Sequence, residues 1–135
     1  MARPVAYLDA SALVKLAVLE QESSELRRSL ESLGDVALAT SMVGRVELER
    51  VGKRLAVEPQ LVEELVDRLV LVGFDVAVAA VAGLVEPPAL RTLDAIHLAT
   101  ARALGTTLDV MYCYDRRLAD AARAVGIDVR SPGAA

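Results

Sequence analysis

The sequence of 135 residues predicts an α/β fold, with a parallel sheet of four to five strands flanked by helices on both faces. Short β-branched or apolar runs alternate with longer segments of helical spacing, and this alternation is typical of a parallel sheet. Two of the strand-like runs end at an aspartate, Asp9 and Asp115. The carboxyl ends of parallel strands are where such folds place their ligand sites. The length fits a single domain, which we expect to cover residues 1–131.

The expected elements follow one another without repeats or linkers. Strands are expected at residues 5–9, 36–40, 108–115 and 127–132, with a further short strand ending at Phe74. Helices are expected at residues 11–19, 22–34, 41–56, 58–72, 92–105 and 116–126. Ser41 is the expected N-cap of the third helix, and Pro59 lies in the first turn of the fourth. Residues 76–84 are expected to be buried whether helix or strand, 85–91 to form a loop, and 132–135 to be a flexible tail.

The composition predicts a cytoplasmic protein that binds itself or a partner. Hydrophobic residues make up 54% of the chain and the mean hydropathy is +0.40, which is more apolar surface than a monomer of this size easily buries. The apolar run 76–85 has ten residues, against the ~20 that a membrane span needs, and the charged N-terminus does not resemble a signal peptide. The single cysteine, Cys113, excludes an internal disulfide and is typical of a reducing cytoplasm.

Each of four carboxylates has an ordinary structural explanation when it is taken alone. Asp9 and Asp115 precede helices, where aspartate is a common N-cap. Asp94 can complement the dipole of its helix, although its apolar neighbours indicate a buried setting in which a carboxylate needs a partner. Glu47 can pair with Arg50 or Arg54 on its own helix, or it can point over the core edge toward the strand ends.

Taken together, the four acids predict a metal site. Acids at two strand ends and on two helices can converge at one edge of the sheet, where their charges repel one another. A hard divalent cation such as Mg²⁺ or Mn²⁺ relieves this repulsion. Beside a phosphodiester, such a cation polarises the phosphoryl group and activates a water molecule. The residues therefore indicate metal-assisted hydrolysis of a phosphoester.

The chain resembles the PIN-domain ribonucleases, and in particular the VapC-like toxins of bacterial toxin–antitoxin pairs, in four blocks that occur in order: "YLDASALVKL", "VELER", "LRTLDAIHLATARALG" and "YDRRLADAARAVGIDV". This resemblance implies a PIN-like fold and an endoribonuclease that depends on one or two Mg²⁺ or Mn²⁺ ions. It also implies that Asp9, Glu47, Asp94 and Asp115 are the catalytic and metal-binding residues, with Glu47 holding a water molecule of the metal or a second ion. The RNA target is left open.

Five further residues are candidates for supporting or substrate contacts. Ser11 either caps its helix or touches a water of the metal, and His97, the only histidine, is expected to make a supporting hydrogen bond. Cys113 stands where many relatives of this kind carry Thr or Ser, and is expected to be a small buried side chain. Arg116 and Arg117 either contact RNA phosphates or face solvent.

Apart from Arg116 and Arg117, the sequence contains few groups that are suited to contact RNA. The net charge is −4, so local arginines or bound cations must carry the contact with phosphates. The helix over 41–56 carries Arg45, Arg50, Lys53 and Arg54, which either grip RNA or pair with nearby acids. Aromatic residues make up only 3% of the chain, which leaves little for base stacking.

The resemblance also implies partners. VapC-like toxins dimerise and bind an antitoxin whose C-terminal segment blocks the acidic pocket, and DNA is contacted only through that antitoxin. The apolar segments 11–19 and 61–72 are candidate contact faces or ordinary core helices.

Other functions remain as alternatives or are excluded by single residues. A catalytically weak regulatory module on the same fold, and a PIN nuclease outside a toxin–antitoxin pair, remain open. A phosphatase of the haloacid-dehalogenase type is excluded because Ser11 stands where its second aspartate belongs. A receiver domain is excluded because neither Lys15 nor Lys53 follows a late strand.

Overall fold

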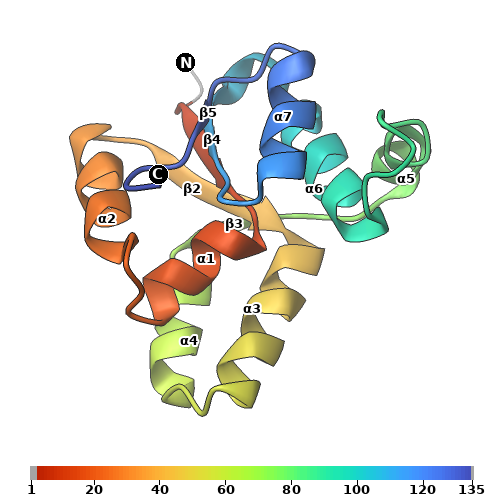
Figure 1. Cartoon of the computed structure of the whole chain (residues 1–135). Helices are drawn as coiled ribbons and strands as arrows, with labels where there is room; N and C mark the ends of the chain where they lie inside the picture. The colour runs from red at the N-terminus through yellow and green to blue at the C-terminus, as the bar shows by residue number, and fades with distance from the viewer. Residues whose placement is uncertain (1–2, 135) are drawn as a thin grey trace.

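A five-stranded parallel sheet forms the centre of the molecule in the computed structural model, which describes residues 3–134 (Figure 1). Its strands are β1 (Val5–Leu8), β2 (Ala37–Ser41), β3 (Leu69–Val72), β4 (Leu108–Tyr112) and β5 (Val129–Arg130). Their order across the sheet is β3-β2-β1-β4-β5, and every pairing is parallel. The chain thus runs outward from β1 to β3 and then returns to the other side of β1. The neighbouring strands β1 and β4 form the switch point at which such sheets bind ligands.

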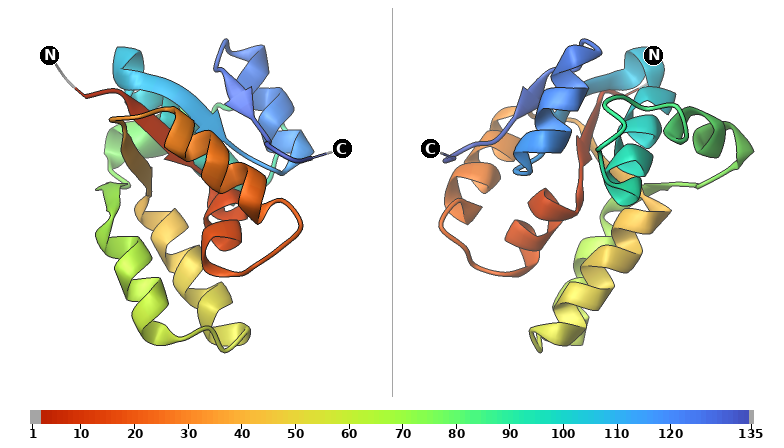
Figure 2. Two further views of the ribbon diagram at one scale, coloured as in Figure 1. Left: turned by 90° about the vertical axis from the view of Figure 1, so that its left-hand side faces the viewer. Right: turned by 45° about the vertical axis from the view of Figure 1, so that its right-hand side comes forward.

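Helices cover both faces of this sheet, so the predicted fold class is confirmed. The seven α-helices among the described residues are α1 (Ala10–Ala17), α2 (Ser23–Ser32), α3 (Met42–Arg54), α4 (Pro59–Asp67), α5 (Val76–Ala82), α6 (Thr92–Ala103) and α7 (Arg116–Ala124). A short 3-10 turn, Gly105–Thr107, leads into β4. Figure 2 shows α3 and α4 as a hairpin that extends from the sheet, while α5 lies at the periphery beside α6.

Alternation along the central strand divides the core into two layers. Leu8 packs with residues of α1, α2 and α4, whereas the adjacent Tyr7 packs with residues of α6 and α7. This follows from the two-residue period of a strand, which sends successive side chains to opposite faces. Both Tyr7 and Leu8 are fully buried. Asp9 is the next residue after Leu8, so it lies at the carboxyl edge of the sheet, where β1 ends.

Two expectations about the middle of the chain were wrong. The helix expected at 58–72 ends at Asp67, and the apolar run that follows forms β3, which ends before Phe74. This segment pairs with β2, with Leu38 beside Leu69, and this tertiary context overrides the local helical spacing. Residues 76–84 are not buried as a segment: Val76 is 87% exposed and Leu84 82% exposed.

The exposure of this segment has a simple cause. α5 packs mainly on α6, so one stripe of the helix is covered and most of the rest faces solvent. Only Val78 of α5 is buried among its described side chains. An apolar composition without helical spacing gives no means of telling which side chains are covered.

The remaining expectations concern ends and surfaces. The N-cap of α3 is Ser41, whose hydroxyl accepts a hydrogen bond from the backbone N–H of Val43, as expected. Residues 132–134 form a turn in which the Pro132 carbonyl accepts a hydrogen bond from Tyr114, while Ala135 lies outside the described residues. Among residues 3–134, every helix is too short or too polar to cross a membrane.

Of the two candidate contact segments, 11–19 buries Ala12 and Leu13 but leaves Leu19 exposed. The segment 61–72 exposes Leu61 and Val70.

Candidate active site

Asp9 lies between β1 and α1 and is held by three hydrogen bonds. Its Oδ1 accepts the Ser11 hydroxyl at 2.6 Å and the backbone N–H of Ala12 at 3.0 Å, which makes Asp9 the N-cap of α1. Its Oδ2 accepts the thiol of Cys113 at 3.3 Å. The side chain is 3% exposed, and this burial raises the pKa of Asp9 above its ordinary value. An ionised carboxylate offers about four lone pairs, so Oδ2 retains one for a further ligand.

Asp115 lies between β4 and α7, separated from the end of β4 by Cys113 and Tyr114. Its Oδ1 accepts the backbone N–H groups of Arg117 at 2.9 Å and Leu118 at 3.2 Å, so it caps α7. The capping interpretation of both aspartates is therefore confirmed, and it does not exclude a second role. Because β1 and β4 are neighbours, with Leu8 beside Tyr112, the two caps bring their carboxylates to the same edge.

Asp94 in the first turn of α6 faces this same edge. Its pKa is raised, first by partial burial and then by the negative charges of Asp115 and Asp9. Electrostatic repulsion of this kind requires that the three carboxylates share one region of space. The three aspartates therefore lie close enough for their charges to act on one another, and their sharing of one metal site stays a prediction.

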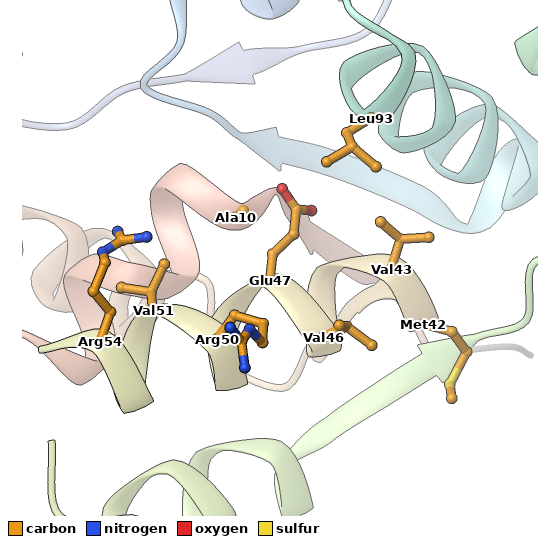
Figure 3. Close-up of a pocket in the computed structure, with 9 residues that line it drawn as sticks. All are labelled: Ala10, Met42, Val43, Val46, Glu47, Arg50, Val51, Arg54 and Leu93. Carbon is orange, nitrogen blue, oxygen red and sulfur yellow. The ribbon is translucent and has the colours of Figure 1, made fainter. Parts of the chain in front are cut away.

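Glu47 reaches the site from α3. Its Oε1 lies 2.7 Å from Nε2 of the buried His97, so the alternative pairing with an arginine of its own helix is not formed. In Figure 3 the Glu47 carboxylate lies between Ala10 and Leu93, which adjoin Asp9 and Asp94 in the sequence. Glu47 thus points toward the strand ends, the other orientation that the sequence left open.

A groove of about 680 Å³ opens beside Glu47. The side chains of α3 form most of its wall, and the starts of α1 and α6 complete it (Figure 3). The wall is largely apolar, apart from Glu47 and two arginines of α3, Arg50 and Arg54. Arg45 of the same helix pairs instead with Glu49 at 3.4 Å.

The five supporting candidates divide into two groups. Ser11, Cys113 and His97 each make a hydrogen bond to one of the acids. The Cys113 thiol is buried, which raises its pKa, and its Sγ also lies 3.3 Å from the Asp115 carbonyl. Arg116 and Arg117 are exposed in the first turn of α7 and contact none of the acids through their side chains.

Sequence reasoning missed one residue of the site, the buried strand residue Tyr7. The Tyr7 hydroxyl lies 2.7 Å from Nδ1 of His97. A signal was present, because the hydroxyl of a tyrosine on a buried strand needs a hydrogen-bond partner. The partner is 90 positions away in the chain, so the sequence alone did not identify it.

The chemistry of these donors suits a hard cation. Within residues 3–134, no three Asp, Glu, His or Cys side chains are already arranged around a common point for an ion. The donors are nonetheless carboxylate oxygens, which Mg²⁺ and Mn²⁺ prefer, and these cations keep several waters and need few protein ligands. Burial is the first cause of the raised pKa of Asp94, and the charges of Asp115 and Asp9 add to it, which is negative charge that a cation would neutralise. The residues therefore fit such an ion.

The PIN-domain family model matches residues 6–124. This chain belongs to the PIN-domain family. Its relatives include Ribonuclease VapC47 of Mycobacterium tuberculosis, 42% identical over 95% of this chain and 97% of the relative. Ribonuclease VapC46 of the same species is 44% identical over 93% of this chain and 96% of the relative. These matches confirm that the chain resembles VapC-like PIN-domain proteins, as we inferred from its sequence.

Solved structures confirm the fold. A toxin–antitoxin complex from Klebsiella pneumoniae matches with a TM-score of 0.71 and 21% identity, over 94% of this chain and 97% of the other. VapBC2 from Rickettsia felis, bound to a DNA fragment from its promoter, matches with a TM-score of 0.68 and 14% identity, over 93% and 97%.

Proposed function

We propose that this PIN-domain chain is an endoribonuclease that depends on Mg²⁺ or Mn²⁺ and acts as the toxin of a toxin–antitoxin pair. The observation that supports it most is the placement of Asp9, Asp94 and Asp115 near the switch point of the sheet, where burial and then the charges of Asp115 and Asp9 raise the pKa of Asp94. The names of the relatives, which are VapC ribonucleases, support RNA as the substrate.

The carboxylates of Asp9, Asp94 and Asp115 would hold the ion, with Glu47 holding a water molecule or a second ion. When bound, the cation supplies charge neutralisation and an acidified water for attack on the phosphodiester. The chain itself fixes the geometry. Two N-caps and the Cys113 thiol hold Asp9 and Asp115 in place, so little reorganisation is needed when substrate arrives.

We further propose that the partners are those of a VapC-like toxin. RNA would be the substrate, and an antitoxin and a second copy of the chain would cover apolar side chains that are exposed here, such as Leu19, Leu61 and Leu84. The complexes from Klebsiella and Rickettsia support the antitoxin, and the latter complex is bound to DNA. We propose that this chain contacts DNA only indirectly, through its antitoxin. The reduced, buried Cys113 suits the cytoplasm.

Incubation with total bacterial RNA tests the proposed activity. The purified, antitoxin-free chain is compared with and without Mg²⁺ or Mn²⁺, and with EDTA. We expect discrete RNA fragments only when the cation is present, and mapping of their ends would identify the target. A folded protein that neither cleaves RNA nor binds Mn²⁺ would contradict the proposal and favour a regulatory module.

A further inference from the structure

A chain of hydrogen bonds connects the core of the sheet to Glu47. The backbone N–H of Ser41 donates to the Tyr7 hydroxyl at 3.2 Å, and that hydroxyl lies 2.7 Å from Nδ1 of His97. Nε2 of the same ring lies 2.7 Å from Oε1 of Glu47. Tyr7 is 0% exposed and His97 1% exposed. Four elements, β2, β1, α6 and α3, thus contribute one group each.

The chemistry of the groups gives this chain a direction. A backbone N–H can only donate, so the Tyr7 oxygen accepts from Ser41 and its own hydrogen is free for Nδ1. A carboxylate can only accept, so the hydrogen on the imidazole belongs on Nε2, facing Glu47. Among the described residues, no buried side-chain nitrogen or oxygen lacks a hydrogen-bond partner. In this arrangement Nδ1 of His97 accepts a hydrogen bond from the Tyr7 hydroxyl, and Nε2 donates one to Glu47.

A glycine in α3 allows this close approach. A Cβ at Gly44 would lie 3.0 Å from Cε1 of His97 and would overlap with Oγ1 of Thr40. Glycine inside a helix is unfavourable relative to alanine, so its presence is explained by a backbone that must approach a neighbour closely. Glu47 follows one turn later on the same helix and reaches the ring from there.

We propose that Tyr7 and His97 are positioning residues, which hold the Glu47 carboxylate at the carboxyl edge of the sheet between the starts of α1 and α6. The proposal rests on the function proposed above. Without the imidazole, Glu47 is free to turn toward Arg50 or Arg54, one and two turns later on its own helix.

Substitutions at His97 separate positioning from packing. In His97→Gln the amide nitrogen takes the place of Nε2 and still donates to Glu47, whereas in His97→Asn it takes the place of Nδ1 and does not reach Glu47. We expect His97→Asn to weaken Mn²⁺ binding by about tenfold or more, the usual effect of losing a partner that orients a metal ligand. The Mn²⁺ affinity of His97→Gln should stay closer to that of the wild type. Mn²⁺ affinity is measured by electron paramagnetic resonance, without RNA.

A milder variant covers the case in which His97 substitutions fail to fold. Tyr7→Phe removes only the hydroxyl, and its matched control is Tyr112→Phe, which removes an equally buried hydroxyl bonded to Ser29 at 2.7 Å on the other face of the sheet. We expect Tyr7→Phe to weaken Mn²⁺ binding and RNA cleavage together, and Tyr112→Phe to change neither. Equal Mn²⁺ affinity in folded Tyr7→Phe and wild type would overturn the proposal.

The single histidine provides a spectroscopic test as well. The ¹⁵N signals of the ring should show hydrogen on Nε2 and none on Nδ1, and Tyr7→Phe should shift the Nδ1 signal. Hydrogen on Nδ1 in the wild type would overturn the proposed direction. If the wild type binds Mn²⁺ but cleaves no RNA, the nuclease function fails. Positioning is then still supported by weaker Mn²⁺ binding in His97→Asn.

Discussion

Asp94→Asn is expected to abolish RNA cleavage while leaving the fold at least as stable as the wild type. Even indirect partners of a metal ligand cost 10- to 100-fold when lost, so removing a ligand should reduce the rate by more than about 100-fold. Burial and the charges of Asp115 and Asp9 raise the pKa of Asp94. The ionised side chain therefore weakens the metal-free fold above its unfolded pKa, and neutral asparagine removes that effect. A gain of ~1 kcal/mol would raise the melting temperature by roughly 4 °C.

The matched control is Asp109→Asn, the same change at the amino end of β4, where the side chain is exposed. Cleavage and melting temperature are measured for both variants, the latter in EDTA. Asp109→Asn should cleave RNA and melt in the same way as the wild type. Substantial cleavage by Asp94→Asn, or a large loss of stability in EDTA, would contradict the role assigned to Asp94.

Two substitutions at Asp9 are expected to have the same effect on activity but different effects on stability. Asp9→Asn and Asp9→Ala both remove the charge, so both should lose cleavage. Asparagine can still accept the N–H of Ala12, whereas alanine loses this cap and leaves the Ser11 hydroxyl without its acceptor. Loss of a cap costs about 0.5–2 kcal/mol, so urea unfolding in EDTA should show Asp9→Ala less stable than Asp9→Asn by about that amount.

Asp75 provides the control for this pair. It caps α5 through the N–H of Val78 at 2.8 Å, on a helix at the periphery. Asp75→Ala should lose stability as Asp9→Ala does but retain cleavage. Equal stability of the two Asp9 variants would show that the cap contributes nothing there, and cleavage by Asp9→Asn would remove Asp9 from the metal site.

The sequence was sufficient for the fold and for the positions of the acids because both depend on local rules. Strand and helix periods are visible within ten residues, and an aspartate directly after a strand lies at the carboxyl edge whatever the order of the strands. For Asp9 and Asp115 the structural and functional interpretations then proved compatible. One oxygen of each carboxylate caps a helix, and the other oxygen is available to the site.

The sequence could not predict contacts that depend on how the helices and strands are arranged in space. Tyr7 meets His97 only because α6 packs on the face of the sheet to which Tyr7 points, and Gly44 has a role only because α3 passes close to that ring. The conformation of residues 69–72 was likewise decided by pairing with β2 rather than by local spacing. Val76 and Leu84 look like core residues by composition, and only the packing of α5 on α6 shows that they are not.

The most direct test of the central claim is an anomalous scattering map from crystals of the chain that contain Mn²⁺. We predict one or two peaks at the carboxyl edge, within about 2.5 Å of carboxylate oxygens of Asp9, Asp94 or Asp115. Glu47 should lie beside them, with His97 still bonded to it. Peaks only elsewhere on the molecule, or none at a concentration of Mn²⁺ that supports RNA cleavage, would contradict the account.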